Sequence, residues 1–468
     1  MLNNDLSDGL KKQVEKIIKK IGPESCIANI EMEFTSPKFP EYKVYLCREI
    51  EELKIHQDFV LNITDKITAE LRMERDPYIG MLYMRKNMNC QLTITFTHPD
   101  RVVDNNEYKR KPDYSSKFKV MVTKWEDLFK KMSTEQLFPE KRRENDHDRK
   151  TFLMSVELLA EDVYKARKES LYFTGRDTNM SDMMRYCINY FGFTKAYYCA
   201  PDNSKPYTNF VIPPSYGVEE IMSFLQNAPG LGIYNDGLIS YIMNGCWYIY
   251  PRYGEPVNKC PIMVYCLGGQ KFAGMNRNDW EEGNQTVPPA TGKFPLHIIS
   301  PSEMKEKSYI SEGSENLPTS YIAQMSDLII DASRTLVNDN KTILEHRTND
   351  PSIVPPDVMD YENFSRIKYI KSKCNIFRIK SEVRSMQTRI LSFHWKHARP
   401  WTFQPATVVY VFYDDHAKLE QAIGMAEKVT YTFTRDSEKS VLFPRWTCDA
   451  DIDVNASVRG EGLLQSQR

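Results

Sequence analysis

The sequence lacks the segments that mark membrane and secreted proteins. No stretch approaches the roughly 18 consecutive apolar residues that a membrane-spanning helix needs. The first residues, MLNNDLSDGLKKQVEKIIKKIG, have neither the apolar core nor the small-residue cleavage site of a signal peptide. We therefore expect a chain that folds in a cytoplasm and does not insert into a membrane.

Paired cysteines and an excess of charge are also missing. None of the ten cysteines forms a CxxC pair, so neither a zinc ribbon nor a thioredoxin-like site is indicated. Most of them lie in apolar runs, where cysteine behaves as a small core residue, and we expect reduced, buried thiols. The 62 Lys and Arg nearly cancel the 63 Asp and Glu, which argues against general nucleic-acid binding.

The common catalytic motifs are absent as well. The chain contains no P-loop, no GxGxxG fingerprint after a strand, no GxSxG elbow and no HExxH. His394 and His397 form the one close histidine pair, but no Cys or carboxylate lies at matching spacing nearby, and a three-residue interval places them on opposite sides of a strand. The sequence predicts a protein that is not an enzyme and holds no cofactor or metal.

What is present is the composition of a globular, multidomain chain. The 468 residues suffice for two to four domains, and 41% of them are hydrophobic. Residues 1–25 predict an amphipathic helix with lysines on its other face. We expect this helix to dock on its own domain or on a partner, with a membrane surface as the alternative; its apolar face comprises Leu10, Val14, Ile17, Ile18 and Ile21.

Two parts of the chain have the two-residue hydrophobic period of antiparallel strands. In residues 26–125 the clearest strand is NCQLTITFT, and DFVLNITDKITAELRM predicts two more strands around a turn. Residues 361–458 contain four further strands before a flexible tail, 459–468. Residues 126–150 are densely charged with both signs, which is typical of a solvated linker.

Residues 151–254 predict a mixed α/β region. TFLMSVELL reads as a strand, NMSDMMRYCINYFG as a buried helix, and GLISYIM with CWYIYP as a hairpin. Pro213-Pro214 forces an extended break, after which Ser215 is expected to cap a short helix. Residues 255–360 predict loops and insertions with one helix, SYIAQMSDLIIDASRTL.

Three carboxylates alternate along the last predicted strand, at Asp449, Asp451 and Asp453. Strand residues two apart lie about 6 to 7 Å from each other, which is a poor arrangement for a cation site. A solvated polar face is the plain interpretation. The alternative is an acidic wall that keeps a passing DNA duplex from adhering, because like charges repel.

The order of features between residues 207 and 254 resembles that of baseplate or tail hub proteins of tailed phages. An Ile-Pro-Pro break leads into the short helix EEIMSFLQN, a Gly-aromatic turn and a hairpin that ends in an aromatic-Pro step. The residues that carry the resemblance are Ile212, Pro213, Pro214, Gly232, Tyr234, Gly237, Tyr248, Tyr250 and Pro251.

The resemblance implies an α+β, mostly β fold, with two antiparallel tube-like β-barrel domains flanking the mixed α/β region and its loop insertions. It also implies a structural virion protein without catalytic residues. In the hub family of contractile tails, a homotrimer forms a pseudo-sixfold ring that joins the tail tube to the central spike and leaves a channel for DNA. The implied partners are the tail tube, central spike and tape-measure proteins and other baseplate subunits, with DNA only in transit and assembly in the host cytoplasm. The channel would then be lined by the three aspartates.

Two other classes of function stay open. One is a receptor- or membrane-associated binding or adaptor protein of the virion, which would use the basic helix. The other is a tail-associated hydrolase of an unrecognised type, which needs a cleft with convergent acid and base residues.

Overall fold

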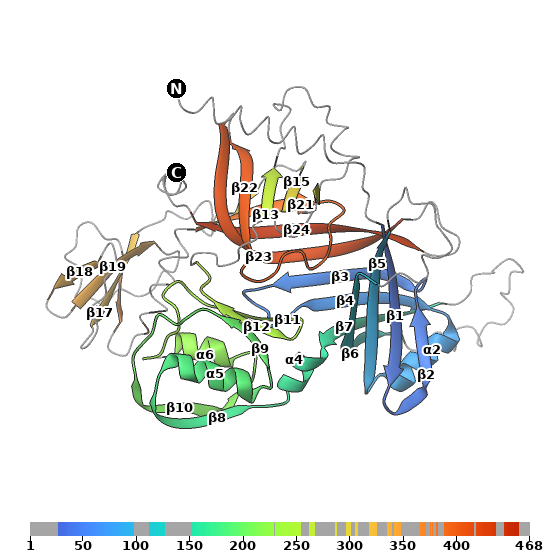
Figure 1. Cartoon of the computed structure of the whole chain (residues 1–468), viewed down its shortest axis with the longest axis horizontal. Coiled ribbons are helices and arrows are strands. Elements are labelled where there is room, and N and C mark those ends of the chain that lie inside the picture. The colour runs from blue at the N-terminus through green and yellow to red at the C-terminus, as the bar shows by residue number, and fades with distance from the viewer. Residues whose placement is uncertain are drawn as a thin grey trace, which may run out of the picture.

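The computed structural model describes residues 27–97, 112–126, 151–228, 230–253, 388–415, 418–436 and 444–457, together with short strands and single residues between 262 and 381. Its architecture is mostly β, as the sequence predicts. Most strands join one 15-stranded sheet, and a mixed α/β unit packs beside it (Figure 1).

The N-terminal part of the chain supplies a run of antiparallel strands. Its strands are β1 Ile27–Ser36, β2 Phe39–Leu46, β3 Ile50–Asp58, β4 Lys66–Met73, β5 Met88–Thr97, β6 Tyr114–Trp125 and β7 Phe152–Ala160. The prediction for NCQLTITFT is confirmed: Cys90, Leu92 and Ile94 are buried, whereas Gln91 and Thr93 lie on the other face. The helix α2 Arg75–Met84 follows β4 and has no counterpart in the sequence prediction.

The C-terminal part supplies four more long strands, as predicted. They are β21 Thr388–Trp395, β22 Val408–Asp415, β23 Lys418–Asp436 and β24 Arg445–Ser457. Shorter strands join the same sheet, namely β13 Ile262–Cys266, β14 Thr286–Val287, β15 Leu296–Ser300 and β16 Lys305–Lys307. The range 255–360, expected to be loop-rich, therefore adds strands to this sheet.

The two sets of strands meet edge to edge. β3 pairs with β23, and β1 touches β24 at Ala28 and Trp446. Because β23 also pairs with β24, hydrogen bonds run in a ring through β23, β3, β4, β7, β6, β5, β1 and β24. Inward side chains of these strands form one apolar core, in which Trp395 and Trp446 are fully buried.

The middle α/β unit packs on this core through a small sheet of β11 Ile239–Met243, β12 Cys246–Tyr250 and β9 Lys195–Tyr198. Its helices α5 Met180–Tyr190 and α6 Ile221–Asn227 lie between that sheet and the pair β8 Leu171–Thr178 and β10 Tyr207–Tyr216 (Figure 1). The short helix α4 Glu161–Ala166 leads into the unit. The predicted buried helix and hairpin are thereby confirmed. β7, at the start of the range 151–254, pairs with β4 and β6 of the large sheet.

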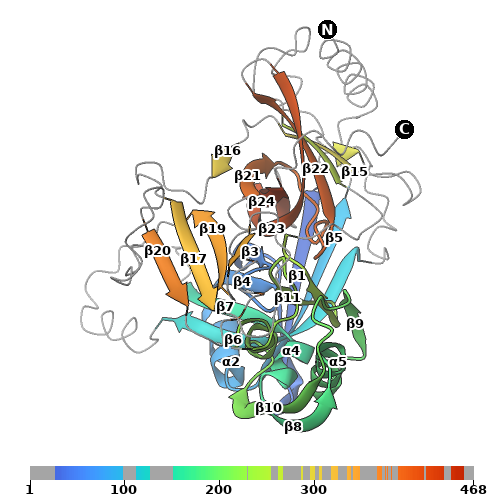
Figure 2. The ribbon, with the colours of Figure 1, turned by 90° about the vertical axis from the view of Figure 1, so that its left-hand side faces the viewer.

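A separate sheet lies at the side of the molecule (Figure 2) and contains β17 Pro318–Gln324, β18 Thr335–Asn338, β19 Lys341–Arg347 and β20 Arg366–Ile370. The helix predicted over residues 320–336 is wrong at its start, because β17 is a strand. Pairing with β19 and β20 satisfies the backbone groups of β17 on both edges, and this outweighs a weak helical period.

Candidate functional site

The three aspartates lie on one face of β24, as their spacing predicts. They alternate with the buried residues Cys448, Ala450, Ile452 and Val454, so they point away from the core. Asp451 is 74% exposed, whereas Asp449 is half-buried. Whether this face lines a channel stays a prediction.

Side chains of β21 contact these aspartates. His394 Nδ1 lies 2.9 Å from Asp451 Oδ1, and its Nε2 lies 3.8 Å from Asp449 Oδ2. The backbone N–H of His397 donates to Asp449 Oδ1 at 3.0 Å, and the Ser392 hydroxyl donates to Asp453. Each aspartate therefore has a partner on β21 or directly after it, while the Asp451 side chain stays largely exposed.

The same polar face continues across the neighbouring strands. Asp451 of β24 lies opposite Thr430 of β23. Thr430 lies opposite His56 of β3, and His56 lies opposite Lys66 of β4. The next row contains Asp449, Thr432, Lys54, Thr68 and Glu157 in the same order of strands, with β7 added. Charges of both signs are thus interspersed over a surface that spans strands from both ends of the chain.

His56 connects the two halves of this face, because its Nδ1 lies 2.8 Å from the Thr430 hydroxyl oxygen. Burial and the nearby Lys428 lower the pKa of His56 below 6.5. Between that lowered pKa and 6.5 the unfolded chain binds more protons than the folded one, so stability falls as the pH decreases through this interval.

Replacing His56 with Gln should reduce this loss of stability in acid, because Gln keeps a polar group near Thr430 but does not titrate. Melting temperatures of both proteins at about pH 7.5 and about pH 5.5 would measure it, on either side of an ordinary histidine pKa. An equal drop in melting temperature for both proteins would show that His56 does not contribute to the acid sensitivity.

The first part of the family-like motif lies at the end of β10. Ile212 is fully buried, whereas Pro213 and Pro214 are exposed at an irregular register in the pairing with β8. The double proline is therefore extended, as expected, but within a strand. The expectation that Ser215 caps the following helix is wrong: Ser215 has a φ of 131°, and α6 begins later, with Glu220 at its N-cap.

The Gly-aromatic turn is held by one buried amide. Gln226 of α6 accepts hydrogen bonds from the backbone N–H groups of Ile233 and Tyr234, each at 3.0 Å, and donates to Tyr234 O at 2.8 Å. Gly232 and Gly237 have positive φ angles of 148° and 74°, which favour glycine. These motif residues therefore have a structural role in shaping the turn.

The aromatic-Pro step lies at the end of β12, next to the Gly-aromatic turn. Tyr250 is buried and Tyr248 is half-buried on β12, and Pro251 directly follows the strand. The Tyr234 hydroxyl donates to Cys199 O at 2.6 Å, beside Ile249 O at 3.2 Å. Burial raises the pKa of Tyr234 and Tyr250 far above its ordinary range, so both side chains stay neutral.

A buried carboxylate joins the middle unit to both parts of the large sheet. Asp65 accepts hydrogen bonds from Gln57 Nε2 at 3.0 Å, from the Tyr241 hydroxyl at 2.6 Å and from Trp401 Nε1 at 2.6 Å. Gln57 lies on β3, Tyr241 on β11 and Trp401 between β21 and β22. Burial raises the pKa of Asp65, and the three hydrogen bonds oppose that rise.

A second joint lies directly after the motif. The Arg252 guanidinium donates to both oxygens of Glu427, at 2.6 and 2.9 Å, and Asn455 Nδ2 donates to Glu427 Oε1 at 2.7 Å. The Glu427 side chain is 7% exposed. Planar, two-point pairing of this kind is the strong form of the Arg–carboxylate contact. We call the contacts of Asp65 and Glu427 the two joints.

The joint residues Asp65, Arg252 and Glu427 were missed in the sequence. A signal existed for Glu427, because the period of Val429, Tyr431 and Phe433 assigns position 427 to the buried side of β23. The five residues of the predicted docking helix, Leu10, Val14, Ile17, Ile18 and Ile21, lie outside the described residues.

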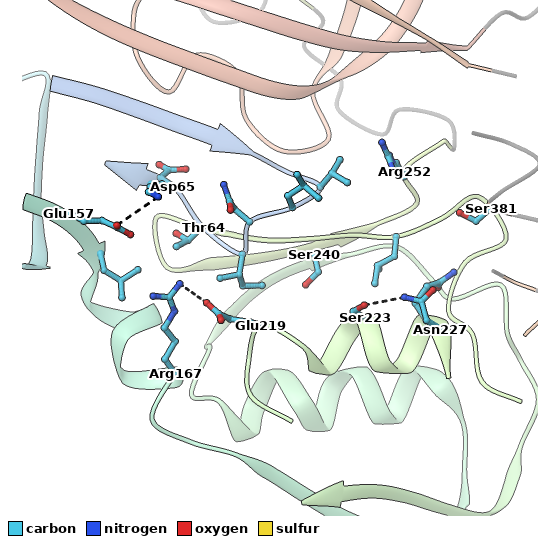
Figure 3. A pocket seen from close by; sticks show the side chains of 18 residues that line it. Thr64, Asp65, Glu157, Arg167, Glu219, Ser223, Asn227, Ser240, Arg252 and Ser381 are labelled. Atoms are coloured by element: carbon cyan, nitrogen blue, oxygen red, sulfur yellow. Dashed lines mark hydrogen bonds and ion pairs between the residues drawn. The ribbon is translucent and has the colours of Figure 1, made fainter. Parts of the chain in front are cut away.

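A groove of about 530 Å³ lies beside the joints, between the turn after β3 and helix α6 (Figure 3). Most of its lining is polar. The ion pairs at the groove are Arg167–Glu219, at 2.5 Å, and Lys66–Glu157, at 3.9 Å. In the part of the chain that the structure describes, no group of three His, Cys, Asp or Glu is arranged to hold a metal, and no helix is long and apolar enough to cross a membrane.

No protein-family model and no curated protein matches the sequence. Among solved structures, the tail protein from Neisseria meningitidis MC58 is 9% identical, with coverage of 91% of this chain and 96% of that chain and a TM-score of 0.47. The 43 kDa tail protein of prophage MuSo2 from Shewanella oneidensis is 10% identical, with 91% and 98% covered and a TM-score of 0.42.

The Francisella PdpA–VgrG complex contains a chain that is 9% identical, with 97% of this chain and 56% of that chain covered and a TM-score of 0.42. These three likenesses are to a tail protein, to a prophage tail protein and to a chain of a complex that contains VgrG.

Proposed function

We propose that the chain is a structural hub subunit of a phage tail or baseplate, located in the virion and assembled in the host cytoplasm. Three copies form a pseudo-sixfold ring that joins the tail tube to the central spike. In this proposal the β regions near 26–125 and 361–458 act as the two tube-like domains, and the joints hold the α/β unit against them.

The observation that carries the proposal is the polar face shared by strands from both ends of the chain. It extends from β21 across β24, β23, β3 and β4 to β7. Asp449, Asp451 and Asp453 repel DNA phosphates, and the interspersed cations Lys54 and Lys66 are each paired with a glutamate, Glu52 and Glu157. Such a surface suits the wall of a passage through which DNA moves.

The edge strand β2 supports assembly with neighbouring chains. Among the described strands β2 pairs with β1 alone, and Phe39, Tyr42 and Tyr45 are exposed on it by 44 to 58%. A long exposed strand with aromatic residues favours pairing with another chain. In the proposed ring, this edge meets the neighbouring subunit. The tape-measure protein and other baseplate subunits are the further partners.

The first test is the mass of the native protein by light scattering, with negative-stain imaging of the same sample. The proposal predicts a trimer with a central hole and a six-lobed outline. A compact monomer at every accessible concentration, alone and with the tail tube protein added, would contradict it.

Changing both Phe39 and Tyr45 to Lys is expected to convert the trimer into monomers, because two charges on the edge oppose strand pairing. Light scattering measures the mass, and a shift of the dissociation constant by at least about 100-fold is expected from a loss of roughly 3 kcal/mol. The matched control is Val211→Lys, which changes a residue of similar exposure (56%) on β10. If the double variant still forms a trimer, β2 is not part of the subunit interface.

A further inference from the structure

In the part of the chain that the structure describes, the small sheet of the middle unit has an open edge at β11. β11 pairs with β12 on one side, and Arg252 N donates to Gly237 O in continuation of that pairing. Backbone groups alternate along an antiparallel strand, so Leu238, Ser240 and Ile242 face away from β12. Ile242 N in fact donates to Ile63 O at 2.6 Å, on that outer side.

The turn after β3 covers only one end of this edge. Thr64 forms a single parallel bridge with Ile242. Before it, the chain folds back, because Asp58 Oδ1 accepts hydrogen bonds from the N–H groups of Val60 and Leu61, at 3.1 and 2.8 Å. The turn therefore moves away from β11 before it reaches Ser240 and Leu238. It leaves the outward N–H and C=O groups of these two residues uncovered.

The groove opens at that point. Ser240 and Leu238 line it from the β11 side, and Ser223 and Asn227 line it from α6 (Figure 3). Its volume of about 530 Å³ lies within the range of roughly 300 to 1,000 Å³ that is typical of ligand sites. Leu238 and Ser240 are half-buried and face this groove, and no strand among the described residues pairs with them on that side.

The lining indicates what kind of side chain the groove accepts. Thr64, Ser223, Asn227 and Ser240 present hydroxyl and amide groups. The charged side chains are engaged within the protein: Arg167 with Glu219, Lys66 with Glu157 and Arg252 with Glu427. A charged ligand would have to break these pairs, so small, uncharged polar side chains fit best.

We propose that this groove binds an extended polypeptide segment of a partner protein, rich in Ser, Thr and Asn, which adds to β11 as a further strand. The segment donates to and accepts from the backbone groups of Leu238 and Ser240, and its side chains meet the hydroxyl and amide lining. Strand addition of this kind obtains affinity from main-chain hydrogen bonds and specificity from the neighbouring side chains. The proposal does not depend on the hub assignment.

Ser240→Pro is the decisive variant. Proline removes one outward N–H group and leaves the β11–β12 ladder intact, because the N–H of Ser240 does not face β12. The matched control is Ser240→Ala, which keeps the backbone N–H. Both variants lose the hydrogen bond that Trp247 Nε1 donates to the Ser240 hydroxyl at 2.9 Å, so this loss cancels in the comparison.

The probe is a library of acetylated and amidated peptides of about nine residues, long enough to span the edge as an extended strand of roughly 3.3 Å per residue. Ser, Thr, Asn and Val are randomised in it. Peptides are selected on the full-length wild-type protein, and their affinities are measured by fluorescence polarisation. We expect the wild type and Ser240→Ala to bind equally and Ser240→Pro to bind at least about tenfold more weakly.

A second measurement does not depend on the folding of a variant. Peptides methylated at alternate backbone nitrogens lose the donors that strand addition needs, and they should bind the wild-type protein at least about tenfold more weakly. Amide exchange in the segment 237–243 should slow when the unmodified peptide binds. The proposal is overturned if no peptide binds, if Ser240→Pro binds as well as Ser240→Ala, or if backbone methylation has no effect.

Discussion

Replacing Arg252 with Met should lower the free energy of unfolding by about 3 kcal/mol, because it leaves the buried Glu427 carboxylate without its two-point cation. Asn455 still donates to Glu427 but does not neutralise its charge. Chemical denaturation followed by circular dichroism measures the loss.

The control is Lys165→Ala, which breaks the exposed pair with Glu161 on α4 and should cost less than about 0.5 kcal/mol. In the double variant Arg252→Met/Glu427→Gln the buried charge is gone, and roughly half of the lost stability should return. If Arg252→Met costs no more than the control, the second joint does not hold the α/β unit on the sheet.

Gly232→Ala should cost about 3 kcal/mol, for two separable reasons. The φ of 148° lies in a region that only glycine adopts readily, and strain there costs roughly 1 to 3 kcal/mol. In addition, a Cβ at this position would lie 2.0 Å from the Phe377 ring. Crowding of that kind adds about 1 to 3 kcal/mol.

A double-mutant cycle separates the two costs. Against a Phe377→Ala background, Gly232→Ala should cost only the backbone strain, about 1.5 kcal/mol. Gly230→Ala is the second control: its φ is 77°, nothing lies within 4 Å of the added carbon, and the expected cost is about 1 kcal/mol. Equal costs for Gly232→Ala with and without Phe377 would show that the ring moves away freely.

The elements that the sequence predicts best are those with a strict period. NCQLTITFT and TCDADIDV alternate without interruption, and both are strands in the expected orientation. The apolar spacing of residues 179–192 predicts α5, and the structure adds that Asn179 caps this helix by accepting a hydrogen bond from Asp182 N. At these places the local sequence pattern agrees with the tertiary structure, so the pattern alone is enough to predict the element.

The misses arise where tertiary contacts decide. The period of SYIAQMSDL is helical, but β17 has partner strands on both edges, and these partners lie far away in the sequence. The joint at Asp65 could not be predicted for the same reason, since Asp65 and its partner Trp401 are 336 residues apart. Asp65 is a single acidic residue in a turn, and nothing in the neighbouring sequence indicates that it is buried and hydrogen-bonded.

The pairing of β3 with β23 has a consequence for synthesis. The contact between His56 and Thr430 joins residues 374 positions apart. At roughly 5 to 20 residues per second, β3 leaves the ribosome about 20 to 75 s before β23 does. During that interval the N-terminal strands have no partner on one edge. An unpaired strand edge favours aggregation, so this topology leaves the growing chain exposed to aggregation until β23 has been made.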